Sequence, residues 1–285
     1  MAIDKIRVSV RSCKGKVRED NEDNFFAGGI TLPCDLQGRD FSLDIVLPAP
    51  TVLAVCDGVG GEAMGKEASA TAVKRLAEIQ DYLISSRSDN LGAAVRAYIL
   101  NADSGISLLG KRSGTTLALA LIEKGNIKCF NVGDSRIYCY KSGKLFRITN
   151  DHTAAVLAAE KNGISSERAR KAARGNKLTR CIGIGNNNRA EEYPPIKGKC
   201  KLLICSDGLT DMISDAEIEK IIACSNSISA AADRLIAEAL RSGGKDNITL
   251  IASEFSDNEL INKLKRKMEK KYEADAPFIS RDYKS

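Results

Sequence analysis

Histidine and tryptophan are nearly absent from this chain of 285 residues, which has one histidine and no tryptophan. Structural zinc sites combine histidine and cysteine at short, regular spacings. The nine cysteines are odd in number, contain no Cys-x-x-Cys pair and are scattered from Cys13 to Cys224. The sequence therefore argues against a zinc site and against a disulfide framework, and it favours buried, reduced thiols.

Long apolar segments are also missing. The longest nearly apolar run, Ile45–Cys56, is interrupted by Pro48, Pro50 and Thr51, and it is too short to cross a bilayer. The first ten residues, MAIDKIRVSV, contain charged residues where a signal peptide would have an unbroken apolar stretch. We therefore expect a cytoplasmic protein without a membrane span.

Aromatic residues make up only 5% of the chain, so side chains that could stack on nucleic-acid bases are scarce. The net charge is +6, and the segment Lys263–Lys271, with six basic residues and one acid, could supply most of that excess. Such a run is typical of a solvated helix face. We expect no nucleic-acid partner; binding of nucleic acid or an acidic surface by the tail remains an alternative.

Residue patterning predicts strands in clusters and helices in pairs. Strands are expected where apolar residues alternate with polar ones or form short runs, and helices where they recur every three or four residues. Predicted strands cover 6–10, 51–56, 115–122, 127–132, 135–140, 145–148, 201–205 and 248–255, with a long-looped hairpin over 28–50. Predicted helices cover about 66–84, 91–109, 153–161, 165–174, 214–224 (opened by a Ser214–Glu217 capping box) and 228–241, and another follows residue 256. This grouping indicates an α+β fold with antiparallel sheets.

Acidic residues stand at the ends of these strands. Asp57 and Asp207 each end an apolar run and precede a glycine, Asp134 lies between two strands, Asp246 precedes the last strand, and the bend 18–23 holds four acids. Carboxylates on rigid elements suit hard cations, and oxygen donors alone select magnesium or manganese. Each Asp-Gly is by itself equally well a turn, so spacing alone indicates no more than a candidate metal site.

The same acids belong to a series of short motifs. In chain order these are Arg18–Asp23, Asp57–Gly61, Ser113–Thr116, Gly133–Arg136, Asp151–His152, Leu178–Arg180, Ser206–Gly208 and Asp246–Asn247. Taken together and in this order, they resemble the metal-dependent protein phosphatase family of type 2C, in its bacterial form, over about residues 6–254.

The resemblance implies a signalling enzyme that hydrolyses phosphoserine and phosphothreonine in proteins by a metal-activated water, without a phosphoenzyme. It implies two Mn²⁺ or Mg²⁺ ions and a possible third. Asp57 would bridge the two ions, Asp207 and Asp246 would bind one of them, and Glu22 and the carbonyl of Gly58 would bind the other.

Three further roles follow from the same resemblance. Asp23 would hold a water bound to an ion, and Asp134 would lie at the third, weaker ion. Arg18 would grip the phosphate, because a planar guanidinium binds two phosphate oxygens at once. An ion pair of Arg18 with Glu19 or Asp20 is the alternative role for that side chain.

Positions 59 and 152 bear on the source of the proton for the leaving group. Many eukaryotic members read Asp-Gly-His-Gly-Gly and use that histidine as a general acid, whereas this chain has Val59 there. Bacterial members commonly carry an apolar residue at this position, and the proton for the leaving group would then come from elsewhere, such as a water on the third ion. The only histidine, His152, is expected to be structural, capping or packing the helix that follows.

The implied architecture is a four-layer α-β-β-α sandwich, two antiparallel sheets flanked by helix pairs, with the metals at one end between the sheets. Residues 1–255 would form the phosphatase domain, with a mobile flap over about 151–190, and residues 256–285 a basic C-terminal helix and tail. Basic flap residues could steer an acidic phosphopeptide or form a solvated helix face: Arg168, Arg170, Lys171, Arg174, Lys177 and Arg180.

The expected partners are phosphoserine and phosphothreonine proteins, the substrates of a cognate serine/threonine kinase, and the chain is expected to be a monomer. Two other functions stay open. One is a catalytically weak or inactive module of the same fold that acts by binding or regulation. The other is a small-molecule or stress-sensor phosphatase of the same superfamily.

Overall fold

The structure is a computed structural model. It describes residues 5–33, 36, 39–60, 64–86, 88–110, 112–123, 125–163, 177–185 and 188–255. The helices expected at about 165–174 and after residue 256, together with the basic tail, lie outside the described residues.

Strands account for much of the described chain. Their bounds are β1 Lys5–Cys13, β2 Asn24–Ala27, β3 Ile30–Thr31, β4 Phe41–Pro48, β5 Thr51–Cys56, β6 Gly58–Val59, β7 Gly114–Thr115, β8 Leu117–Glu123, β9 Asn126–Val132, β10 Arg136–Lys141, β11 Lys144–Arg147, β12 Glu191–Glu192, β13 Ile196–Lys197, β14 Lys201–Cys205 and β15 Ile248–Phe255. The long strands fall where alternation or a short apolar run predicted them.

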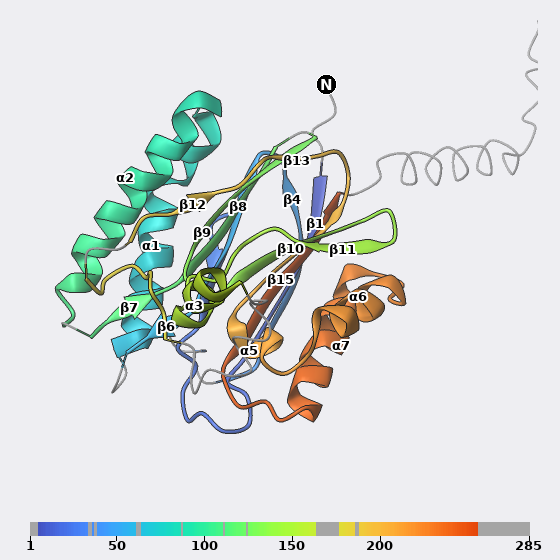
Figure 1. The fold of residues 1–285 in the computed structure, drawn as a ribbon. Coiled ribbons are helices and arrows are strands. Elements are labelled where there is room, and N and C mark those ends of the chain that lie inside the picture. Colours follow the sequence, from blue (N-terminus) through green and yellow to red (C-terminus); the bar gives the residue numbers. More distant parts are fainter. Residues whose placement is uncertain are drawn as a thin grey trace, which may run out of the picture.

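Two antiparallel sheets form the middle of the molecule (Figure 1). One has the strand order β11-β10-β14-β15-β1-β4, and the other has the order β12-β9-β8-β5-β2-β3, with β13 also paired to β9. β6 and β7 form a small separate pair. The strand β5 is buried along its whole length, because it lies between β2 and β8 and is covered on both faces.

The hairpin expected over residues 28–50 is not formed. β3 turns back onto β2, and β4 pairs with β1 in the other sheet. The cause is the Gly28-Gly29 turn after β2, where both residues have positive φ (57° and 97°). Glycine adopts this conformation without steric cost, which favours a tight two-residue connection.

Helices cover the outer faces of both sheets, which makes four layers (Figure 1). Their bounds are α1 Met64–Ser85, α2 Ser88–Ser107, α3 Ala154–Asn162, α5 Asp207–Thr210, α6 Asp215–Ala223 and α7 Ile228–Arg241. α1 and α2 lie on the sheet that contains β5, and α6 and α7 lie on the sheet that contains β1. The capping box of Ser214 and Glu217 opens α6 as predicted. The four-layer α+β sandwich is therefore confirmed.

Apolar side chains fill three layers between these elements. One lies between α1, α2 and the β5 sheet, a second between the two sheets, and a third between the β1 sheet and α5–α7. The described cysteines are free thiols, and all of them except Cys224 are buried, in line with the sequence. None of the described helices is long and apolar enough to span a membrane.

The sandwich brings the predicted strand ends together. Asp57 follows β5 in one sheet, Asp207 follows β14 in the other, and Asp134 lies in the connection from β9 to β10 that joins the two sheets. Asp246 shortly precedes β15, and Asp23 directly precedes β2. The elements that begin at these ends, α5 and β6, lie at the same lower end of the molecule (Figure 1).

The layer beneath α1 is expected to carry a large share of the stability. Leu76 is fully buried there, so Leu76→Ala should lower the free energy of unfolding by about 2–5 kcal/mol. Leu100 on α2 is 60% exposed, and Leu100→Ala should change it by no more than about 0.5 kcal/mol. Denaturant unfolding followed by circular dichroism checks both variants; equal effects would contradict the layer assignment.

Candidate metal centre

Buried carboxylates gather at the common end of the two sheets. The pKa of Asp57 is raised well above its usual value, first by burial and then by the negative charges of Asp23, Asp207, Asp134 and Asp246. These five residues come from five different parts of the chain. The fold therefore assembles the aspartates that the sequence singled out.

Asp207 and Asp23 are equally unusual. The pKa of each is raised to about 7, mainly by burial and in part by the charge of Asp246. A hydrogen-bonding interaction with Asp57 offsets part of the rise in the pKa of Asp207. Ser206 donates a hydrogen bond of 2.8 Å to Asp23 Oδ2 and partly offsets the rise there.

Asp134 and Glu22 complete the cluster. Burial raises the pKa of Asp134 well above its usual value, and the charges of Asp207 and Asp151 add to the rise. Burial also raises the pKa of Glu22, while Arg18 lowers it. Acidic groups held close in a buried place favour a bound cation, because a cation offsets both their desolvation and their mutual repulsion.

The donor set fits a hard divalent cation. All of its donors are carboxylate or carbonyl oxygens, the ligands that magnesium and manganese prefer. Within the part of the chain that the structure describes, no three Asp, Glu, His or Cys side chains already lie close enough together to hold a metal ion.

At two glycines of this cluster, neighbouring backbone oxygens lie too close for any side chain to fit. A Cβ on Gly58 would lie 2.1 Å from the carbonyl oxygen of Gly65 and 2.5 Å from that of Glu22. A Cβ on Gly208 would lie 1.9 Å from the carbonyl oxygen of Asn247. No side chain fits at either place, so the glycine after each of the two central aspartates is required by packing.

Hydroxyl groups hold the backbone of Asp57. Its N–H donates to Thr116 Oγ1 at 2.9 Å, and its carbonyl accepts from the Thr116 N–H and the Thr115 hydroxyl, both at 2.9 Å. Thr116 is itself hydrogen-bonded to Ser135 at 2.7 Å. The Ser-Gly-Thr-Thr motif therefore fixes the position of Asp57, a role that sequence reasoning did not assign.

Asn247 ties the acidic bend to the start of β15. Its Oδ1 accepts from the Glu22 N–H at 2.8 Å, and its Nδ2 donates to the carbonyls of Lys14 and Asp20 at 3.0 and 2.7 Å. Sequence reasoning recorded the Asp246-Asn247 pair without giving the asparagine a role. An amide next to a candidate metal ligand is the signal that could have suggested one.

Arg18 lies at the rim of the cluster. Its Nη2 donates to Asp246 Oδ2 at 2.7 Å, and its side chain is 51% exposed. The hydrogen bond to Asp246 is the main cause that raises the pKa of Arg18. Among the described contacts its ion-pair partner is therefore Asp246, whereas the alternative named Glu19 or Asp20.

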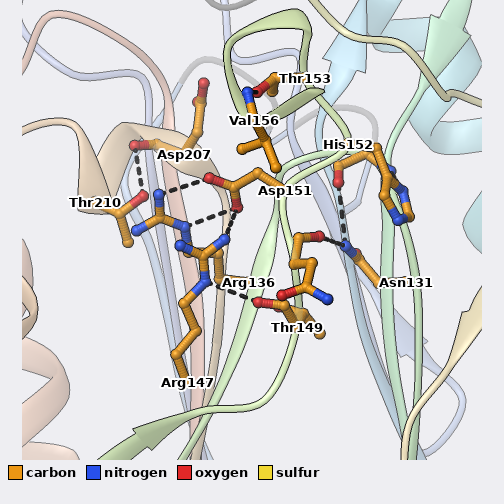
Figure 2. A network of polar contacts seen from close by, with 12 residues as sticks. Asn131, Arg136, Arg147, Thr149, Asp151, His152, Thr153, Val156, Asp207 and Thr210 are labelled. Carbon is orange, nitrogen blue, oxygen red and sulfur yellow. Dashed lines mark hydrogen bonds and ion pairs between the residues drawn. The ribbon is translucent and has the colours of Figure 1, made fainter. Parts of the chain in front are cut away.

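A buried ion-pair network supports the centre from the side (Figure 2). Arg136 donates two hydrogen bonds to Asp151, at 2.9 and 2.8 Å, and Arg147 also donates to Asp151. Asp207 lies beside Arg136 (Figure 2), and the positive charge of Arg136 lowers the pKa of Asp207. The sequence motifs contained Arg136 and Asp151 but gave no sign of their pairing.

His152 is buried and packs against the loop before Asp134. Its Nδ1 accepts from the Gly133 N–H at 3.1 Å, so the proton is on Nε2, which donates to Glu191 Oε2 at 2.9 Å. Burial is the main cause that lowers the pKa of His152. The expected structural role agrees with this placement, but among the described residues its side-chain contacts are with Gly133, Glu191 and Arg180, and none is with the following helix. The expected capping role is wrong, because Thr153 caps α3.

The structure also describes Val59 and two of the basic flap residues. Val59 is partly buried in β6, opposite Gly114 of β7. Arg180 is partly buried and Lys177 is exposed. The other basic flap residues lie outside the described residues: Arg168, Arg170, Lys171 and Arg174.

Comparison with known sequences places this chain near bacterial phosphatases. The model of the protein phosphatase 2C family matches residues 36–243. The chain is 32% identical over 258 residues to the serine/threonine phosphatase stp of Listeria welshimeri. The alignment covers 86% of this chain and 94% of that relative. The family model spans three of the clustered aspartates, Asp57, Asp134 and Asp207.

Solved structures show the same likeness. The Mycobacterium tuberculosis serine/threonine phosphatase PstP/Ppp superposes with a TM-score of 0.71 at 29% identity, over 88% of this chain and 98% of that one. The catalytic domain of the serine/threonine protein phosphatase PstP in complex with two manganese ions gives a TM-score of 0.70 at 28% identity, over 89% and 100%.

The raised pKa values predict a pH-dependent effect of Asp207→Asn on metal-free protein. The folded pKa of Asp207 is about 7 against an ordinary 3.8, so the folded state binds more protons than the unfolded state between these values. The free energy of unfolding therefore falls as pH rises through this window. The variant loses this penalty, and its melting temperature relative to wild type should be higher at pH 8 than at pH 5.

Thermal unfolding in EDTA at both pH values provides the measurement. Asp81→Asn, at an exposed position on α1, serves as the control and should track the wild type. A difference between Asp207→Asn and wild type that does not depend on pH would contradict the prediction.

Proposed function

Because the chain belongs to the protein phosphatase 2C family, we propose that it is a metal-dependent phosphatase of phosphoserine and phosphothreonine in proteins. The observation that carries this function is the cluster of buried carboxylates with raised pKa values around Asp57, with the exposed Arg18 at its rim. Relatives that bear the name serine/threonine phosphatase support the substrate class.

Manganese or magnesium is the proposed cofactor. Asp57 would contact both ions of a pair, Asp207 and Asp246 would hold one, and Glu22 and the Gly58 carbonyl would hold the other. When bound, two such cations supply the positive charge that activates a water and stabilises the phosphoryl oxygens. The two manganese ions in the PstP catalytic domain support a pair.

A third, weaker ion is proposed next to Asp134. In its support, Asp134 is buried, and the negative charge of Asp207 adds to the rise of its pKa. Asp23 would accept a hydrogen bond from a water at the centre in addition to those from Ser206 and Thr249.

Arg18 would bind the phosphate of the substrate. One of its nitrogens is already bonded to Asp246, and the exposed guanidinium retains further donors that can pair with phosphate oxygens. Val59 has no proton to give, so we propose that the leaving serine or threonine oxygen takes its proton from water.

The setting of the enzyme is a further part of the proposal. We infer that a cognate serine/threonine kinase makes its substrates and that the chain acts as a monomer. A cytoplasmic location is supported by the buried free thiols, since reduced cysteines are typical of that compartment.

An inactive binding module of the same fold is the rival function. Loss of a metal-binding carboxylate would be its mark. All of the expected acids are present, and the central ones lie close enough for their charges to raise one another's pKa. Catalysis is therefore favoured over binding alone.

Turnover should depend on metal and on the central aspartates. Hydrolysis of p-nitrophenyl phosphate and of a phosphothreonine peptide should need Mn²⁺ or Mg²⁺ and stop in EDTA. Asp57→Asn and Asp207→Asn should each lower kcat by roughly 100-fold or more, because each removes charge that holds a cation. Asp81→Asn is the matched control. Turnover that persists in EDTA or survives Asp57→Asn would refute the function.

Val59→His is expected to change kcat only modestly. Val59 is partly exposed and is flanked by Gly58 and Gly60, so an imidazole has room without disturbing the carboxylates. Initial rates across pH with the phosphothreonine peptide measure the effect. A complete loss of turnover would show that Val59 packs where an open site is assumed.

A further inference from the structure

A cavity of about 460 Å³ lies between α2 and β12, and none of the clustered carboxylates lines it. Its wall contains three arginines and two glutamates over an aromatic ring: Arg96, Arg180, Arg189, Glu191, Glu192 and Phe130. Its size suits a side chain with some of its backbone better than a small ion.

The arginines of this cavity carry positive charge that no carboxylate among the described residues pairs with. Among the described residues, neither Arg96 nor Arg189 has an ion-pair partner, and both side chains are exposed. Arg180 has its Nη1 3.4 Å from His152 Nε2. Since that nitrogen carries the imidazole proton, it does not neutralise the guanidinium.

Of the two glutamates in the wall, Glu191 accepts hydrogen bonds and Glu192 lies against α2. Glu191 accepts hydrogen bonds from His152 at 2.9 Å and from Asn150 at 3.1 Å. The carboxylate of Glu192 lies over Gly92 of α2, where a Cβ would come within 2.7 Å of its Oε2. With three arginines against two carboxylates, the lining retains one positive charge and three guanidinium forks.

A single imidazole connects the cavity to the metal centre. His152 contacts Gly133, the residue before Asp134, on one side, and Glu191 and Arg180 of the cavity on the other. A peptide whose phosphorylated residue lies at the carboxylate cluster therefore has the cavity within reach of its neighbouring residues.

We propose that this cavity binds a second anionic side chain of the phosphoprotein substrate, either a phosphorylated residue or a carboxylate, apart from the phosphate that is hydrolysed. The proposal rests on the proposed function and specifies its substrates as acidic or multiply phosphorylated segments. Guanidinium groups pair with both kinds of anion through two parallel hydrogen bonds.

The test compares two peptides on the full chain with Mn²⁺. One is a phosphothreonine peptide with neutral flanks, and the other has the same sequence with acidic or phosphorylated residues at successive distances from the phosphothreonine. In the double variant Arg96→Gln/Arg189→Gln, KM for the acidic peptide should rise roughly five- to tenfold. The kcat, the KM for the neutral peptide and the rate on p-nitrophenyl phosphate should stay unchanged.

The control is Arg241→Gln, an exposed arginine on α7 in the opposite helical layer, which should leave all of these values unchanged. Equal changes of KM for the acidic and neutral peptides in the double variant, or no change, would overturn the proposal. A double variant that alters inhibition by inorganic phosphate but not KM for the acidic peptide would also overturn it, because the cavity would then take the free ion.

A binding titration separates this proposal from the proposed function. A non-hydrolysable acidic phosphonate peptide should bind wild type more tightly than the double variant. If wild type binds the peptide more tightly than the double variant but hydrolyses no phosphate, the proposed function is refuted and the cavity proposal stands. If both proteins hydrolyse phosphate and bind the peptide equally tightly, the cavity proposal is refuted and the proposed function stands.

Discussion

Negative charge held in a buried place is the constraint on which the rest of this structure depends. Asp57, Asp207 and Asp23 lie next to each other at the end of the two sheets, and burial raises the pKa of each. Such an arrangement is costly in the absence of a cation. The apolar layers on both sides of each sheet supply the stability that holds the carboxylates in place.

A shell of neutral hydrogen bonds and one ion-pair network does the positioning. Thr116 and Asn247 bind backbone groups of Asp57 and of the acidic bend, and Ser206 binds a carboxylate oxygen of Asp23. Arg136 places a positive charge beside Asp207 while its own hydrogen bonds go to Asp151. Because most of these partners are neutral, they orient the acids without neutralising them, and the cluster keeps its affinity for cations.

Much of the fold could be predicted from local patterns. The buried strand β5 and the helix α7 lie where a short apolar run and helical spacing predicted them. The hairpin over 28–50 was wrong because the partner of a short edge strand depends on its turn: the Gly28-Gly29 turn sends β3 back to β2. His152 was read as a cap or a packed residue, and the neighbouring Thr153 made the cap instead.

By itself, the sequence determined the residue types, their order and the strand ends at which the acids stand, because apolar periodicity and turn residues act over short distances. Only the tertiary structure decided that these ends meet. The two sheets bring together Asp57 and Asp207, which are 150 positions apart in the chain, and shield both partly from water. Proximity and burial together raise their pKa values, and both depend on long-range packing that no local pattern encodes.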